Sequence, residues 1–219
     1  MHIGVLSYHP QPPSPMLLQE CSMWQKGIPA FIKQGHHFSW ITTQTAVDLT
    51  IKAGFPWRVH AATLPQTCSN VIPCQAYAAP GLSIYVVDQP IWQQAAFHTR
   101  LFTFLCLLQR ASPWTLLHAL GHFPAPYLAV YTARFLGLPV VVSYDEPALC
   151  PDPRYAFAWS WAARHATLAL VRSPADRQRL ITTAGIVATK VRCLAPHPQA
   201  WQTLMALYQS MLCPETSLR

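Results

Sequence analysis

The sequence predicts an α/β fold in which a mostly parallel sheet of about seven strands is flanked by helices. Three observations lead to this prediction. Short apolar runs alternate with amphipathic helical segments along nearly the whole chain. Several of the expected helix starts carry a proline or a capping side chain. At 219 residues and 52% hydrophobic content, the chain is also long enough to bury one large core.

The clearest unit lies in the middle of the chain. Thr115–Ala119 is an apolar run too short for a helix, and Pro139–Ser143 contains three consecutive valines, so both predict buried strands. A helix is expected between them, from near Pro124 to a left-handed cap at Gly137. Because a crossover of this length forces its two strands parallel, the sheet is expected to be mostly parallel, with any antiparallel strands at its edge.

The N-terminal part repeats the same alternation. His2–Ser7 predicts the first strand, and Ser14, followed by a proline, predicts the start of a helix over Met16–Lys33. Gly35 suits the end of that helix, and Ser39–Thr43 predicts the second strand.

The next segment contains two further predicted strands, Trp57–Thr63 and Leu82–Asp88. Leu64–Gly81, between them, has no clear periodicity, so we expect an irregular connection, either an ordinary surface loop or a lid over an acceptor. Ile91–Gln109 predicts one helix, because its apolar residues form a single stripe: Phe97, Leu101, Phe104, Leu105 and Leu108.

After the central unit the pattern continues to the end of the chain. We expect a helix over Asp152–His165, a strand over Thr167–Arg172 and a helix from Ser173 to Gly185. A last amphipathic helix is expected over 200–213. The predicted organisation is an α/β domain over 1–199, this helix packing back on the domain, and a tail over 214–219.

The composition limits the environment and the partners. Charged residues make up 11% of the chain, against roughly 25% in ordinary soluble domains, so a surface rich in apolar groups is expected. The net charge of +7 suits phosphates, anionic lipid headgroups or nucleic acid, but the basic residues are scattered, which does not favour nucleic acid. Seven cysteines without a C-x-x-C pair, and no signal-type N-terminus, favour a cytoplasmic protein, with peripheral contact at the inner membrane left open.

Familiar catalytic motifs are missing from the sequence. There is no G-x-G-x-x-G, Walker loop or G-x-S-x-G, so dehydrogenase, kinase and hydrolase chemistry have no local support. His118 and His122 have the spacing of a zinc pair, but no glutamate lies between them, and the spacing spans a strand end and a loop. No metal and no cofactor are predicted.

Three stretches resemble, in the correct order, the N-terminal lobe of family 4 glycosyltransferases with the GT-B fold. They are QGHHF followed by a strand, LLHALGHFPAPYLAVYTARFLGLPVVVSYDEP, and ATLALVRSPADRQRLITTAGIVATKVRCLAPHP. The resemblance implies a single Rossmann-like domain of the GT-B N-terminal-lobe type, retaining sugar-transfer chemistry, and a sugar or nucleotide-sugar ligand.

The chain departs from this family at three places. The family's glycine turn after the first strand reads YHPQPPSP, whose prolines offer no N–H to a phosphate. The family's catalytic histidine position holds Tyr144. Only 23 residues follow Pro196, whereas a second lobe that holds the nucleotide sugar needs at least about 50. The last predicted helix resembles the one that crosses back onto the first lobe in GT-B enzymes.

The resemblance and the strand ends together give the candidate site. The catalytic candidates are Tyr144, Asp145 and His9. The substrate-binding candidates are Tyr8, His118, His122, Glu146, Ser173 and Lys190. Because tyrosine titrates near pH 10, Tyr144 is expected to be a weak proton acceptor at neutral pH.

Two functions follow as the main hypotheses, and a third, an RNA or lipid-surface binder, is supported only by the positive charge. The chain is either the acceptor-side half of a glycosyltransferase-like enzyme that works with a separate donor lobe, or a non-catalytic binding or scaffold module, a pseudoenzyme, derived from one. In both cases the loops after the parallel strands are expected to form an open, aromatic face that a partner covers. That partner is a second copy, giving a homodimer, or a separate GT-B C-terminal-lobe protein. The face is expected to contain Tyr8, His9, Pro12, His122, Phe123, Tyr144 and Pro147.

Overall fold

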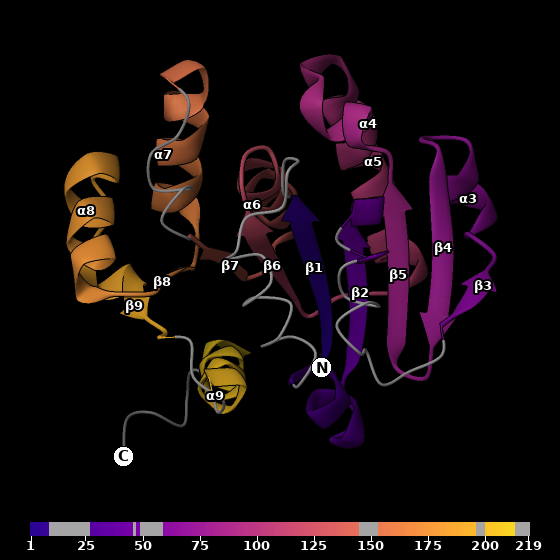
Figure 1. The fold of residues 1–219 in the computed structure, drawn as a ribbon, viewed down its shortest axis with the longest axis horizontal. Helices are drawn as coiled ribbons and strands as arrows, with labels where there is room; N and C mark the ends of the chain where they lie inside the picture. The colour runs from indigo at the N-terminus through magenta and orange to yellow at the C-terminus, as the bar shows by residue number, and fades with distance from the viewer. Residues whose placement is uncertain (9–26, 46, 49–58, 145–152, 196–199, 213–219) are drawn as a thin grey trace.

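A nine-stranded sheet forms the middle layer of the described part of the protein (Figure 1). The structure, a computed structural model, describes residues 1–8, 27–45, 47–48, 59–144, 153–195 and 200–212. The strands are β1 (His2–Tyr8), β2 (His37–Thr42), β3 (His60–Ala62), β4 (Cys74–Ala79), β5 (Leu82–Val87), β6 (Leu116–Gly121), β7 (Val140–Ser143), β8 (Leu168–Val171) and β9 (Val191–Cys193). Their order across the sheet is β3-β4-β5-β2-β1-β6-β7-β8-β9.

The pairing of the strands confirms the predicted fold class. The seven strands from β5 to β9 in this order are parallel to one another. At the other edge β4 is antiparallel to both β5 and β3. The sheet thus contains the seven predicted strands, of which the one at 57–63 corresponds to β3 at the antiparallel edge, and two more, β4 and β9, which make it larger than expected.

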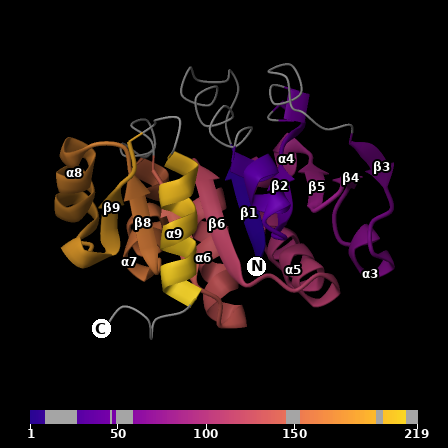
Figure 2. The ribbon, with the colours of Figure 1, turned by 90° about the horizontal axis from the view of Figure 1, so that it is seen from below.

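Helices cover both faces of this sheet (Figures 1 and 2). On one side lie α5 (Ala95–Ala111), α6 (Ala125–Leu136) and α7 (Ala156–His165), with the shorter helices and α8 beside them; on the other side lie α9 (Ala200–Leu212) and the helical residues 27–33. The remaining elements are α3 (Gln66–Ser69), α4 (Gln89–Gln93), η2 (Pro153–Tyr155), α8 (Pro174–Ala184) and η3 (Ala188–Lys190).

Each face of the sheet has its own apolar core because side chains alternate along a strand. In β1, Leu6 and Tyr8 point to the core under α5, α6 and α7, whereas Ile3 and Val5 point to the core under α9. The strands β1, β5, β6, β7 and β8 are buried on both faces and therefore read as continuous apolar runs, as parallel strands usually do. This is why the sequence identifies them so clearly.

The predicted helix ends are confirmed at α6 and α8. Gly137 follows α6 with φ 69° and Gly185 follows α8 with φ 65°, both in the left-handed region that glycine adopts without strain. At the start of α8 the side chain of Ser173 accepts a hydrogen bond from the backbone N–H of Asp176, as an N-cap does.

One predicted connection is wrong. Residues 64–81 contain α3 and the strand β4, which pairs with β5 through a tight turn at Gly81, where φ is 71°. β4 reads CQAYAA, and its residues are at most half-buried. Alanine and glutamine have little strand preference, so pairing with β5, not local sequence, determines this strand.

Two other boundaries differ from expectation. The helix predicted over 91–109 is two helices, α4 and α5, separated at Gln94, whose backbone is extended. Its apolar stripe is confirmed, since Leu101, Phe104, Leu105 and Leu108 are buried. The strand predicted over 57–63 is described only at β3, His60–Ala62. The predictions for His9, Pro12, residues 16–26, Asp145, Glu146, Pro147, Asp152 and the tail fall outside the described residues.

Candidate functional site

The carboxyl ends of the parallel strands are the first place to look for a site, because open α/β sheets bind their ligands there. Tyr8 at the end of β1 is level with Gly121 at the end of β6, and Leu120 is level with Ser143 at the end of β7. The chain turns away after β6, where Gly121 has φ 83°, and the backbone N–H of His122 donates to the carbonyl of Tyr8 at 3.0 Å. Tyr8 and His122 are therefore neighbours.

Tyr8 does not lie on an open face, contrary to expectation. Its ring is 4% exposed and stacks on Trp92 of α4, with the ring centroids 5.6 Å apart and the planes 22° apart. Strand alternation explains the difference, because every second residue of β1 points to the core beneath α5 and α6. The proximity of a strand end to the site thus says nothing about which way its last side chain points.

Tyr144 is buried for the same reason, and its predicted exposure is also wrong. Val140, Val142 and Tyr144 share one face of β7 and its continuation, and the Tyr144 ring packs edge-on against Trp159 of α7, with centroids 5.6 Å apart. Burial raises the pKa of Tyr144 well above the ordinary value for a phenol. The hydroxyl in this position therefore keeps its proton and cannot act as a base.

Four buried donors near this edge make no hydrogen bond in the described part of the chain. They are the hydroxyl groups of Tyr144 and of Thr43, which follows β2, and the indole N–H groups of Trp159 and Trp92. Buried polar groups are usually paired, and an unpaired one costs about 1–3 kcal/mol. Each of these donors could bind an oxygen atom of a ligand if the packing above it opened.

A hydrogen-bonded polar cluster occupies the other face of the same strand ends. The hydroxyls of Ser7 and Thr42 are 2.7 Å apart, and the indole N–H of Trp40 donates to Ser7 at 2.8 Å. Ser7 and Thr42 are fully buried. The cluster joins β1 to β2 just inside the carboxyl edge and fixes the position of these strand ends.

His118 belongs to a second cluster on this face. Its Nε2 is 2.7 Å from the hydroxyl of Ser143, and its Nδ1 is hydrogen-bonded to the hydroxyl of Tyr208 in α9. A neutral imidazole has one donor and one acceptor nitrogen, and hydroxyl groups can serve either. The ring is fully buried, and burial lowers its pKa to about 3. In this arrangement His118 ties α9 to the sheet and presents no ring atom to a ligand.

The remaining substrate-binding candidates lie apart from one another. His122 is half-buried at the carboxyl edge, and Ser173 follows β8 at the same edge, where its hydroxyl donates to the Asp176 carboxylate at 2.7 Å. Lys190 precedes β9 at the opposite edge, and its ammonium group donates to the carbonyl of Ala166 at 3.3 Å. The structure thus brings His122 close to Tyr8 and separates Lys190 from both.

Sequence reasoning missed four members of the two polar clusters. They are Trp40 and Thr42 in the first cluster and Ser143 and Tyr208 in the second. The available signal was a polar residue on the inward side of an otherwise apolar strand, since such a group needs a buried partner. The partner itself could not be read from the sequence, because 90 residues separate His118 from Tyr208.

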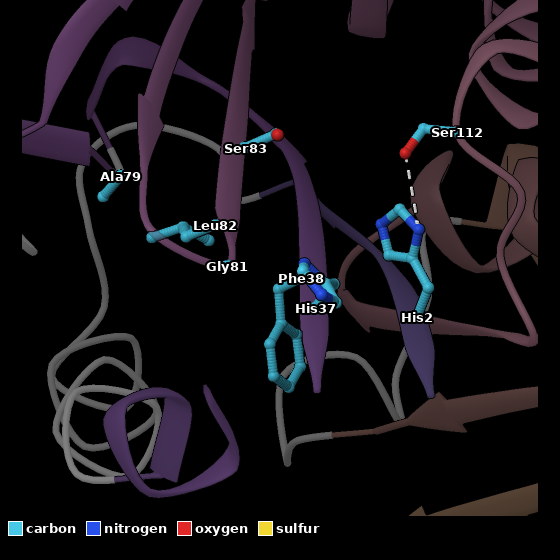
Figure 3. A pocket seen from close by; sticks show the side chains of 8 residues that line it. All are labelled: His2, His37, Phe38, Ala79, Gly81, Leu82, Ser83 and Ser112. Carbon is cyan, nitrogen blue, oxygen red and sulfur yellow. Dashed lines mark hydrogen bonds between the residues drawn. The ribbon is translucent and has the colours of Figure 1, made fainter. Parts of the chain in front are cut away.

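A pocket of about 330 Å³ lies at the amino ends of β1, β2 and β5, at the opposite end of the strands from the carboxyl edge (Figure 3). Its polar side is formed by His2, whose Nε2 is 2.9 Å from the hydroxyl of Ser39 and whose Nδ1 is 3.4 Å from that of Ser112. Burial and the neighbouring His37 lower the pKa of His2. We favour the carboxyl edge as the functional site, because this pocket lies at the edge that open parallel sheets do not use for ligands.

The described residues offer neither a metal site nor a membrane-spanning helix. No three histidine, cysteine, aspartate or glutamate side chains there come close enough together to hold a metal ion. Within the same ranges, every helix is too short or too polar to cross a bilayer.

Comparison with known proteins identifies the fold. No model of a protein family matches the sequence, and no curated protein is significantly similar to it. Solved structures do match. UDP-N-acetylglucosamine 2-epimerase from Rickettsia bellii has a TM-score of 0.58 and 13% identity over 100% of this chain and 52% of its own. A sucrose-phosphate synthase chain from Thermosynechococcus elongatus has a TM-score of 0.60 and 12% identity over 96% of this chain and 99% of its own.

A third match was solved with ligands. Anabaena HepE in complex with UDP and glucose has a TM-score of 0.55 and 15% identity over 90% of this chain and 44% of its own. The chain spans about half the length of the epimerase and of HepE. These matches show that the described domain has a Rossmann-like α/β fold similar to that of part of the epimerase and of HepE. At such low identity they establish the fold alone.

Proposed function

We propose that this chain is the acceptor-side half of a GT-B sugar-transfer enzyme and that another polypeptide supplies the lobe that binds the nucleotide sugar. The observation that carries the proposal is the match to the sucrose-phosphate synthase chain over 96% of this chain and 99% of that one, together with a last helix, α9, packed onto the sheet. The epimerase is matched over only 52% of its own length, which also supports a chain that corresponds to one of two lobes.

The carboxyl edge supports an acceptor role better than a catalytic one. Tyr144, at the position that the family resemblance makes catalytic, is buried and remains protonated. The unpaired donors of Tyr144, Trp159 and Trp92 are suited to hydroxyl oxygens of a sugar or a similar acceptor. Among the described residues at this edge, His122 is half-buried and lies next to Tyr8, so it is the candidate that we expect to contact the acceptor. Donor phosphates would be held by the other lobe.

A second candidate function is a non-catalytic binding module with the same fold. The burial of Tyr144 favours it, because the position that holds the family's catalytic histidine then takes part only in packing. The two functions differ in one property. The enzyme half acquires sugar-transfer activity when its partner is present, and the binding module does not.

Co-purification tests the proposal directly. The tagged chain is isolated from its source cells, its partners are identified, and the complex and the chain alone are assayed for transfer from UDP-glucose and UDP-N-acetylglucosamine. We expect turnover by the complex, none by the chain alone, and a loss of turnover in His122→Ala. A folded complex that never turns over a nucleotide sugar favours the binding module. Rapid turnover by the chain alone contradicts both.

A further inference from the structure

The outer face of α5, α6 and α7 carries a continuous network of aromatic rings. Each ring in it touches the next, with centroids 4.1–6.5 Å apart. The helices lie side by side on one side of the sheet (Figure 1). The network joins Phe102 of α5 to Tyr127, Tyr131 and Phe135 of α6 and to Trp161 of α7, and continues through Phe123 to Tyr155 at the carboxyl edge.

This aromatic face is open to solvent. Phe135 is 70% exposed, Tyr131 is 47% exposed, and Phe157, one helical turn before Trp161, is 76% exposed. Of the large apolar side chains exposed among the described residues, only Val187 lies elsewhere. A group of exposed rings on neighbouring helices, rather than scattered ones, usually marks a contact surface.

The charges on the same helices all have one sign. α5, α6 and the segment from η2 through α7 contain five arginines and neither aspartate nor glutamate. Arg134 lies three residues after Tyr131, and Arg164 three residues after Trp161, so both share the outward side of their helices with those rings. Both are exposed, as is Arg110 at the end of α5. The acidic residues described in the structure, Asp48, Asp88 and Asp176, lie on other elements.

This charge pattern distinguishes between two candidate partners for the aromatic face, a second copy of the chain and an anionic lipid surface. A second copy of the chain, related by a two-fold axis, would place the same basic face against itself, and the described residues of that face offer no carboxylate to pair the arginines. An anionic lipid surface provides what the face lacks, since lipid phosphates accept hydrogen bonds from arginine and aromatic rings settle at the boundary between headgroups and acyl chains.

We propose that the aromatic and arginine-bearing outer face of α5, α6 and α7 docks this protein on an anionic lipid bilayer. The binding is peripheral: rings such as Phe135 and Phe157 enter the headgroup layer, and Arg110, Arg134 and Arg164 contact lipid phosphates. Each arginine at an anionic surface strengthens binding roughly fivefold. Rings that enter the layer add an apolar contribution that salt does not screen.

Vesicle co-sedimentation of the full chain tests this proposal. One vesicle preparation is phosphatidylcholine alone, and the other is phosphatidylcholine mixed with phosphatidylglycerol. We expect binding to the mixed vesicles that weakens as salt is added, and little binding to the neutral ones. Arg134→Gln with Arg164→Gln should weaken binding by about 25-fold, and Phe135→Ser with Phe157→Ser by at least ~10-fold. These residues are exposed, so circular dichroism and thermal melting should show folded variants.

The matched control is Val187→Ser with Arg179→Gln, which also removes one exposed apolar group and one exposed arginine but lies at α8 and just beyond it. It should bind mixed vesicles like the unchanged chain. Equal binding to neutral and anionic vesicles, absence of binding to either, or an equal loss in the control overturns the proposal. Light scattering that shows a dimer dissociated by Phe135→Ser and Phe157→Ser, without vesicle binding, overturns it in favour of a second copy.

Discussion

The hydroxyl of Tyr208 and the imidazole of His118 are hydrogen-bonded inside the core, although 90 residues separate them along the chain. Their rings also meet edge to face, with centroids 5.8 Å apart. The other ring nitrogen of His118 binds Ser143, so one buried histidine connects β6, β7 and α9. This contact, together with the packing of Leu204 and Met205, holds the last helix on the sheet (Figure 2).

Replacement of Tyr208 by phenylalanine tests this connection. The ring packing is kept, but Nδ1 of His118 loses its hydrogen bond to the Tyr208 hydroxyl in a fully buried site, which should lower the free energy of unfolding by about 1–3 kcal/mol. Urea unfolding followed by circular dichroism measures the change. The matched control is Tyr131→Phe on the exposed face of α6, which should change stability by less than about 0.5 kcal/mol. Equal effects of the two variants would contradict the role of Tyr208.

The low pKa of His118 predicts a pH dependence of stability. The unfolded chain binds a proton at this residue below about pH 6.5, whereas the folded protein stays neutral there down to about pH 3. The unfolded state therefore binds more protons in this window, and stability should fall by up to ~1.4 kcal/mol per pH unit as the pH drops from 6.5 towards 3. Above pH 6.5 the contribution of His118 is constant.

Unfolding measured at several pH values in His118→Gln checks this prediction. The variant should start less stable at neutral pH but should lose much less stability on acidification than the unchanged chain. His60→Gln, an exposed histidine of β3, is the control and should keep the full acid dependence. Parallel curves for the unchanged chain and His118→Gln would show that another group causes the acid sensitivity.

Tyr144→Phe should be neutral or stabilising by about 1–3 kcal/mol, because the substitution removes a buried hydroxyl that has no partner in the described part of the chain. The ring contact with Trp159 remains. Thermal and urea unfolding measure the effect, and Tyr144→Ala, which leaves a cavity, should instead cost about 3–5 kcal/mol. A clear loss of stability in Tyr144→Phe would mean that the hydroxyl is hydrogen-bonded after all.

Ser173→Ala should lower stability by about 1 kcal/mol, because the serine hydroxyl is the acceptor for the N–H of Asp176 at the start of α8. Thr183→Ala in the same helix is the control. Thr183 is exposed and lies near the end of the helix, so the substitution should change the free energy of unfolding by less than about 0.5 kcal/mol. A larger effect of Thr183→Ala than of Ser173→Ala would contradict the assigned cap.

The sequence predicted the parallel part of the sheet well, because strands such as β6 and β7 are buried on both faces and therefore read as continuous apolar runs. It predicted the ends of α6 and α8 because Gly137, Ser173 and Gly185 have local backbone or capping roles. It missed β4, whose half-buried residues have little strand preference and depend on pairing with β5.

The candidate site was harder to predict than the fold. The order of elements correctly placed Tyr8, His122 and Ser173 at the carboxyl edge. It did not reveal that strand alternation directs Tyr8 and Tyr144 into the core. The partners of His118 depend on contacts between distant parts of the chain, which a local pattern does not encode.

The central claim is that this chain holds the acceptor side of a two-lobe enzyme and leaves the nucleotide sugar to a partner. Isothermal titration of UDP-N-acetylglucosamine or UDP-glucose into the isolated chain, and into its complex with the co-purified partner, tests it most directly. The account predicts saturable binding by the complex and none by the isolated chain. Saturable, stoichiometric binding of either nucleotide sugar by the isolated chain would contradict it.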